Sequence, residues 1–173
     1  LLRISPLQFV VIVKADSAEQ LWQKLALNFT PAGIGYWQLQ SIRAGQACVQ
    51  AETFEEFVPQ MLNLQATGAV NFKKGCYTGQ EIVARMQYLG KLKRRTYRVV
   101  IETLAPPQVA TEIYASANNK LVGSVLIAAS ADEKSVEILA VLHEEQADAS
   151  SFVIDGETLK VRIADLPYSL TSP

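Results

Sequence analysis

The residues best suited to chemistry lie in one short stretch, residues 73–81, which reads Lys-Lys-Gly-Cys-Tyr-Thr-Gly-Gln-Glu. Cys76 stands two residues before Thr78, and Thr78 with Glu81 has the spacing of a capping box that starts a helix. Backbone N–H groups at a helix start, together with Lys73 and Lys74, would favour the Cys76 thiolate, which is the nucleophilic and metal-binding form. The competing interpretation is a buried, unreactive cysteine in a glycine turn.

The neighbours of Cys76 favour the approach of a ligand or partner. Gly75 and Gly79 remove side chains on either side of it, and Tyr77 offers a stacking face with a polar tip. Cys48, between two small or apolar residues, is interpreted as a packing residue. A second aromatic candidate, Trp37, follows Gly-Ile-Gly and could stack a flat heterocycle, although core packing, which is expected for Trp22, is the simpler role.

Charge is unevenly distributed along the chain. The 173 residues hold 16 Lys and Arg against 17 Asp and Glu, a formal net charge of -1. Residues 73–98, however, hold eight cations and one acid, so the remainder is strongly acidic. This window predicts either a solvated basic face or a local anion site for a carboxylate-bearing cofactor, a phosphate or an RNA backbone.

Two cysteines and one histidine exclude several kinds of site. A structural zinc or iron–sulfur site usually needs four Cys or His ligands, so this chain is not expected to hold a metal alone, although two partners could each supply a cysteine to a shared cluster. His143 is expected at the surface, and no Ser–His–Asp arrangement is evident. Few cysteines, no secretory signal and no long apolar run predict a soluble cytoplasmic protein without a membrane partner.

The elements that must position these residues change in character near residue 90. Residues 7–15 are predicted to form a central strand, and Ser17 with Gln20 a capping box that opens a helix. Residues 36–43 are ambiguous between helix and strand. A capping box at Thr53 and Glu56 predicts a short helix, and the one at Thr78 predicts a helix that ends at Gly90.

After residue 90 the pattern is that of short strands. Asp155-Gly156 is a strong hairpin signal among them. We therefore predict an α+β chain with a first domain over residues 1–90 and a second over 91–173, the latter a small closed barrel or sandwich. Six strands are predicted, over residues 96–102, 112–115, 120–128, 136–142, 151–154 and 158–163.

Four segments resemble one known family. Residues 74–81 (KGCYTGQE) match a highly specific motif, and residues 37–45, 57–64 and 166–170 resemble three further family segments. On these segments the chain is identified as similar to the YgfZ family of folate-binding, tRNA-modifying and iron–sulfur-maintenance proteins, which are related to the glycine-cleavage aminomethyltransferase.

The resemblance implies a fold, a cofactor and a site. It implies the C-terminal part of an aminomethyltransferase-like folate-binding domain, followed by a small antiparallel β-barrel. Cys76 would be the family's signature functional thiolate, and Trp37 would line the tetrahydrofolate site. The chain opens without Met on an apolar stretch, and the longer relatives support the expectation of residues missing upstream. The remaining motif residues, expected to contact the cofactor, are Lys74, Gly75, Tyr77, Gly79, Gln80, Glu81 and Arg85.

Three functions compete at this point. The first is a tetrahydrofolate-binding auxiliary protein that supports iron–sulfur enzymes, such as those that thiolate tRNA. The second is a folate-dependent one-carbon transferase, and the third is an RNA-binding interaction module that uses the basic window. The resemblance favours the first.

Overall fold

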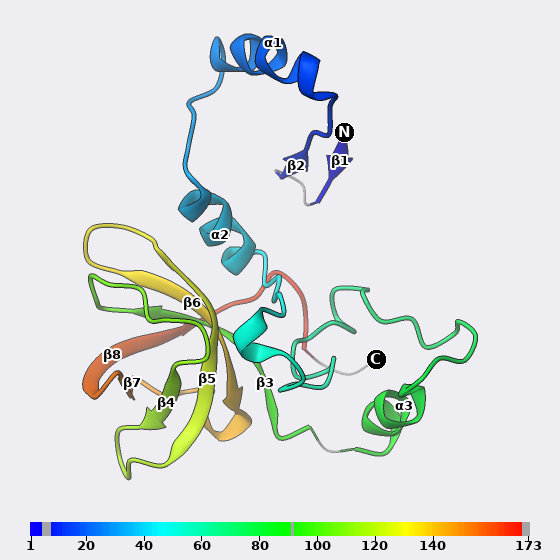
Figure 1. The fold of residues 1–173 in the computed structure, drawn as a ribbon. Coiled ribbons are helices and arrows are strands. Elements are labelled where there is room, and N and C mark those ends of the chain that lie inside the picture. The colour runs from blue at the N-terminus through cyan, green and yellow to red at the C-terminus, as the bar shows by residue number, and fades with distance from the viewer. Residues whose placement is uncertain (5–7, 91, 171–173) are drawn as a thin grey trace. The chain divides into compact units, whose positions relative to one another are not determined.

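The structure is a computed structural model, which describes residues 1–4, 8–90 and 92–170 (Figure 1). Leu7, the first residue of the predicted strand, and Lys91, one cation of the basic window, lie outside the described residues. The chain forms two compact units, Leu1–Ile34 and Gly35–Pro173. The predicted division into residues 1–90 and 91–173 stays a prediction, although the change from helices and turns to long strands does fall there.

The first unit holds a two-stranded antiparallel sheet and one helix: β1 (Leu2–Arg3), β2 (Phe9–Val10) and α1 (Ala15–Ala26). The prediction of a long central strand over residues 7–15 is wrong. Strand pairing involves only two residues on each side, and the apolar run that follows, including Ile12 at 73% exposure, lies at the surface. A run of β-branched residues is buried only when another layer covers it.

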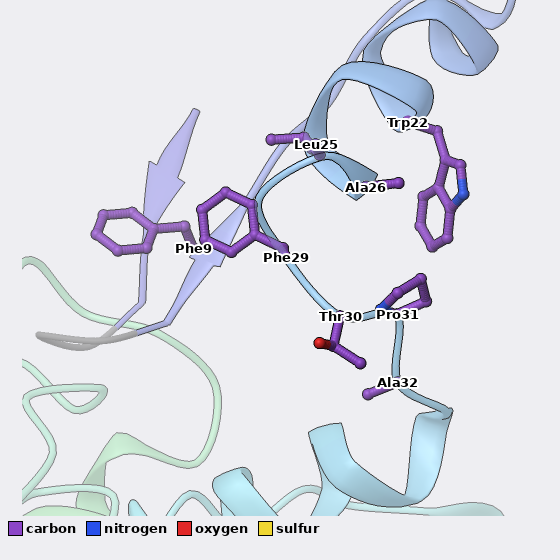
Figure 2. A pocket seen from close by; sticks show the side chains of 8 residues that line it. All are labelled: Phe9, Trp22, Leu25, Ala26, Phe29, Thr30, Pro31 and Ala32. Carbon is purple, nitrogen blue, oxygen red and sulfur yellow. The ribbon is translucent and has the colours of Figure 1, made fainter.

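Helix α1 begins earlier than its sequence predicts. Its N-cap is Lys14, which makes no side-chain cap, so Ser17 lies inside the first turn and the predicted capping box is wrong. Trp22 is 59% exposed, against the prediction that it belongs to the core. Phe9, Leu25 and Phe29 line with it an apolar pocket of about 440 Å³ within this unit (Figure 2).

The second unit begins with helical and turn segments. Residues 36–43, ambiguous in sequence, form most of α2 (Ile34–Arg43), and α3 spans Gln80–Tyr88. The helix predicted from Thr53 is instead a single 3-10 turn, η1 (Ala51–Thr53), in which Thr53 is the third residue and its Oγ1 accepts the Gln50 N–H at 3.0 Å.

All six predicted strands form and close a barrel, so the sandwich alternative is excluded. The strand order around the barrel is β3-β6-β5-β4-β7-β8, with each neighbouring pair antiparallel. Asp155 and Gly156 have φ values of 51° and 81°, as the predicted two-residue turn between β7 and β8 requires. The strand bounds are β3 Arg94–Ile101, β4 Glu112–Ala115, β5 Leu121–Ser130, β6 Val136–His143, β7 Ser151–Ile154 and β8 Glu157–Ala164, with a 3-10 turn η2 (Glu144–Gln146) after β6.

Two apolar clusters meet on strand β6. Alternate residues such as Ile138 and Leu142 fill the barrel interior. The intervening residues Leu139 and Val141 face outward and pack against Leu39 and Ile42 of α2. Because both faces of β6 are covered, α2 is held on the outside of the barrel as a fixed platform.

A turn-rich segment, residues 59–68, connects α3 with the barrel. Asn63 Nδ2 donates to the Thr96 carbonyl of β3 at 2.8 Å, and Thr96 Oγ1 donates to the Met61 carbonyl at 2.8 Å. Gln60 Nε2 donates to the Val83 carbonyl inside α3 at 2.6 Å. Buried side-chain amides thus replace regular secondary structure as the link between the two elements. Among the described residues, no helix has the length and apolar character that a membrane span needs.

Candidate functional site

Cys76 lies in an exposed loop that leads into α3. Its side chain is exposed and forms no disulfide, so the buried-cysteine interpretation is wrong. The helix starts at Gln80, with Gly79 as N-cap, so the predicted Thr78–Glu81 capping box is not formed and Cys76 stands three residues before the cap. Cys48, expected in the core, is exposed as well.

The loop is shaped by local interactions. Asn71 Oδ1 accepts the Lys73 N–H at 2.8 Å, and the Phe72 ring meets the Tyr88 ring edge-on, with 5.9 Å between the centroids. The second contact joins the start of the loop to the far end of α3. Gly79 has a φ of 86°, a left-handed conformation that explains glycine at the helix entrance.

The loop presents a cation beside an aromatic ring. Lys74 Nζ lies over the Tyr77 ring, 4.5 Å from its centroid, so the ammonium is held on an aromatic face within the loop that contains Cys76. A Cβ added at Gly75 would meet no atom within 4 Å, which leaves open space next to Cys76. The loop therefore offers an accessible thiol, a positive charge and room for a reactant.

Helix α3 carries the rest of the motif in several environments. Glu81 and Arg85 are exposed, while Gln80 is half-buried. Val83 is the one buried residue described in this helix, and its carbonyl accepts the hydrogen bond from Gln60. The amide of Gln60 therefore anchors the helix at its buried residue, while Glu81 and Arg85 face outward.

Trp37 belongs to a separate element, α2, and is 40% exposed. Leu39 and Ile42 turn the opposite face of this helix towards the barrel. The helix closes at Gly45, where the Gly45 N–H donates to the Ile42 carbonyl and the Gln46 N–H to the Ser41 carbonyl, each at 3.0 Å. Tyr168 Oη donates to the Gly45 carbonyl at 2.8 Å, and burial raises the pKa of this tyrosine.

A buried carboxylate fastens α2 to the barrel. Glu137 of β6 accepts hydrogen bonds from Arg43 Nε and Nη2, at 3.0 and 2.8 Å, and from Arg98 Nε at 2.8 Å. Burial alone would raise the Glu137 pKa, but the hydrogen bonds and charges of the two guanidinium groups outweigh it and lower the pKa below the usual 4.5. Sequence reasoning missed this residue, although an acid inside the apolar run of residues 136–142 signals a paired charge.

The predicted site residues fall into two groups. Trp37 lies on α2, which packs against the outside of the barrel, whereas Cys76 lies in the loop that leads into α3. The basic window is divided too: Arg95 pairs with Glu144 and Arg98 with Glu137. No ion pair involves Lys73, Lys74, Arg85, Lys93 or Arg94 within the part of the chain that the structure describes.

Metal ligands do not gather in the described ranges. Residues 1–4, 8–90 and 92–170 contain no group of three His, Cys, Asp or Glu side chains that could hold a metal ion.

Curated proteins give close matches over nearly the whole chain. A tRNA-modifying protein YgfZ from Yersinia enterocolitica is 34% identical over 167 residues, which are 95% of this chain and 51% of that protein. Those from Serratia proteamaculans and Escherichia coli O127:H6 are 36% and 32% identical, over 94% of this chain and 50% and 51% of their own lengths. This chain is a homologue of the YgfZ proteins. It spans about half the length of the YgfZ relatives it matches, and no family model matches it.

A solved structure shares the fold of this YgfZ homologue. It is glycine cleavage system aminomethyltransferase T from Bartonella henselae, with a TM-score of 0.63 and 15% identity, over 88% of this chain and 44% of that one. The predicted α+β class, with an aminomethyltransferase-like fold and an antiparallel barrel, is confirmed.

Proposed function

We propose that this chain is part of a tetrahydrofolate-binding auxiliary protein that acts in tRNA modification and supports iron–sulfur enzymes, such as those that thiolate tRNA. The homologues' name, tRNA-modifying protein, supports the biological role. The observation that carries the proposal is the exposed Cys76 beside open space at Gly75 and the Lys74–Tyr77 pair. The protein works in the cytoplasm, where thiols stay reduced.

Cys76 is the functional thiolate in this proposal. Its loop leaves the sulfur accessible to a macromolecule or a small carrier, and α3 is anchored through the Gln60–Val83 hydrogen bond. The thiolate acts towards a one-carbon unit, a sulfur species or the cluster iron of a client enzyme. The nearby cations that form no ion pair with other described residues, including Lys73 and Arg85, attract an anionic partner or the glutamate carboxylates of the folate.

Trp37 supplies one wall of the folate site. Its partly exposed ring suits stacking on a flat heterocycle such as a pterin or its neighbouring ring. Bound tetrahydrofolate supplies a one-carbon carrier. The other walls come from the rest of a protein of the homologues' length.

Complementation tests the role of Cys76. A deletion strain receives the full-length protein, its Cys76→Ala variant or a Cys48→Ala variant, and tRNA thiolation and iron–sulfur enzyme activity are measured together. Both cysteines are exposed, so Cys48→Ala is a matched control for loss of a surface thiol. We expect only Cys76→Ala to lose both activities. Full restoration by Cys76→Ala would refute the proposed thiolate.

Folate affinity tests Trp37 separately. Tetrahydrofolate binding to the full-length protein is measured by calorimetry for wild type, Trp37→Ala and Trp22→Ala. Trp22 is also exposed, so it controls for the loss of a surface indole. We expect about tenfold weaker binding for Trp37→Ala only, as for the loss of one stacked ring. Equal affinity of all three proteins would remove Trp37 from the site.

The first competing function is that of a folate-dependent one-carbon transferase, which the aminomethyltransferase-like fold makes testable. Turnover of a methylene- or formyl-tetrahydrofolate by the purified full-length protein would identify a one-carbon transferase rather than an auxiliary protein. The second competing function is that of an RNA-binding module that uses the basic window. Such a module would bind free tRNA with an affinity that falls steeply as the salt concentration rises.

A further inference from the structure

A cavity of about 490 Å³ is lined by the 59–68 segment, α3 and the adjacent ends of β3 and β6. Its volume lies in the range of about 300–1,000 Å³ that is usual for small-molecule sites. Neither α2 nor the Cys76 loop contributes to its described lining, so the cavity is distinct from the site proposed above. The lining residues are Met61, Met86, Leu92, Lys93, Arg94 and His143.

Three side chains with nitrogen donors form the polar part of the lining. Arg94, the first residue of β3, is directly opposite His143, the last residue of β6, so their Cβ atoms lie about 4.5–5.5 Å apart on one face of the sheet. The carbonyl of Lys93 accepts the Glu144 N–H at 3.0 Å, which holds Lys93 beside that pair. Lys93 is exposed, and Arg94 and His143 are half-buried, so a ligand in the cavity can reach all three.

The two permanent positive charges have no ion-pair partner among the described residues. Neither Lys93 nor Arg94 takes part in an ion pair there, and no acid belongs to the described lining. Glu144, the acid that follows His143, is already paired with Arg95. A half-buried guanidinium without a partner carries a desolvation cost, so the cavity is suited to an anion.

The rest of the lining is apolar. Thr96 lies two residues from Arg94 on the same face of β3, and its Oγ1 donates to the Met61 carbonyl at 2.8 Å, which fixes Met61 over that face. Met86 of α3 and Leu92 complete the apolar lining, and both are half-buried. Methionine side chains adapt to the shape of a ligand and contact aromatic rings favourably through sulfur. A ligand that fills the cavity therefore has an apolar or aromatic body as well as an anionic group.

We propose that this cavity binds a phosphate monoester with an apolar or aromatic ester group. Such a phosphate carries a charge of about −1.5 to −2 at neutral pH, which matches two permanent positive charges, whereas a carboxylate carries one negative charge. Lys93 and Arg94 pair with the phosphate oxygens, and His143 donates a hydrogen bond to them. The source is a small phosphate ester or the terminal phosphate of an RNA, and only the RNA source rests on the proposed function.

Calorimetric titration of the full-length protein with three probes tests the ligand class. Phenyl phosphate carries both groups, benzoate replaces the phosphate by a carboxylate, and inorganic phosphate lacks the ring. We expect phenyl phosphate to bind at least about tenfold more tightly than either of the other two. No binding of phenyl phosphate, or an affinity equal to that of benzoate or of inorganic phosphate, overturns the proposal.

Matched variants test the position of the site. Arg94→Gln should lower the affinity for phenyl phosphate about tenfold, and His143→Gln should lower it less, because a charged donor contributes more than a neutral one. The control is Arg162→Gln, which should stay within about twofold: Arg162 is an exposed arginine of β8 that does not line this cavity and forms no ion pair with a described residue. Circular dichroism checks that the variants fold. An equal loss in Arg162→Gln would refute a localised site.

Two further titrations separate the sources and the competing ligand. A short single-stranded RNA is compared with and without a 5′-phosphate. Tighter binding of the phosphorylated RNA that is lost in Arg94→Gln assigns the RNA terminus, and equal binding assigns a small phosphate ester. Displacement of phenyl phosphate by tetrahydrofolate would assign the cavity to the folate carboxylates and overturn the proposal. Cys76→Ala should keep the affinity for phenyl phosphate while tRNA thiolation is lost, so this proposal and the proposed function can fail independently.

Discussion

Replacing Glu137 with glutamine should loosen α2 from the barrel and lower the stability of the second unit. The carboxylate is 4% exposed and accepts three N–H groups from two guanidinium groups. Hydrogen bonds to charged groups contribute about 1.5–3 kcal/mol each, and removing one partner of a buried pair costs about 3–5 kcal/mol. Arg43 is 42% exposed and can turn to water, so the cost falls below that of a fully buried pair, to about 2–4 kcal/mol.

The free energy of unfolding is measured by urea titration, followed by the fluorescence of Trp37 in a Trp22→Phe background. A thermal scan of the same proteins gives the melting temperature, which should fall by roughly 6–12 °C at about 3 °C per kcal/mol. The matched control is Glu102→Gln, because Glu102 pairs with Lys160 at 4.0 Å with both side chains exposed. Such a surface pair contributes no more than about 0.5 kcal/mol.

The pH dependence provides a second check on Glu137. Its pKa in the folded protein lies below the usual 4.5, so the unfolded chain takes up the proton first as the pH falls. The stabilisation is therefore present above pH 4.5 and is lost as the pH falls through the folded-state pKa. The difference between wild type and Glu137→Gln should shrink below pH 4.5. A stability equal to that of wild type at neutral pH, or a difference that does not change in acid, would refute the ion-pair account.

Three other changes test the packing. Gly45→Ala should destabilise the folded protein by about 1–3 kcal/mol, because Gly45 has a φ of 66° and an added Cβ would lie 2.7 Å from the Tyr168 ring. Gly75→Ala is the control: an added Cβ there would meet no atom within 4 Å, so the melting temperature should not change. Gly123→Ala should prevent barrel formation, seen as loss of the folded circular dichroism spectrum, because its Cβ would clash with the Val141 carbonyl oxygen of the neighbouring strand. Tyr168→Phe should cost about 1 kcal/mol, the loss of one hydrogen bond. Because burial raises the Tyr168 pKa above 10.0, the stabilisation that this tyrosine gives the folded state is present below pH 10.0 and is lost as the pH rises through the folded-state pKa. Unfolding curves recorded at alkaline pH should show this loss of stability for wild type and not for Tyr168→Phe.

The barrel was predictable because its signals are local. Short β-type runs and turn residues such as Asp155-Gly156 determine pairing between neighbours in sequence, and all six strands appear. Helix starts were less predictable. Ser17 and Thr78 have the spacing of capping residues, but Lys14 and Gly79 occupy the caps, because the surrounding chain decides where the backbone turns.

The features of the candidate site that could not be predicted from the sequence depend on partners that are distant along the chain. Glu137 pairs with Arg43, 94 residues away, and no local pattern identifies that partner. Gln60 lies in a recognisable segment, yet its hydrogen bond to the interior of α3 depends on how residues 59–68 fold. The exposure of Cys76 and Trp37 is likewise a property of the assembled chain. The residue types of Cys76 and Trp37 indicate which chemistry they could do, whereas their exposure to solvent is determined only when the chain folds.

Strand β6 has a consequence for cooperativity. Ile138 and Leu142 belong to the barrel interior, while Leu139 and Val141 belong to the cluster under α2, so one strand serves two hydrophobic cores. Neither core can open without exposing residues of the same backbone segment to water. Local unfolding of the platform that bears Trp37 is therefore coupled to opening of the barrel. A ligand that stabilises α2 would slow hydrogen exchange throughout β6. A destabilising substitution in the barrel would lower the affinity for that ligand without contacting it.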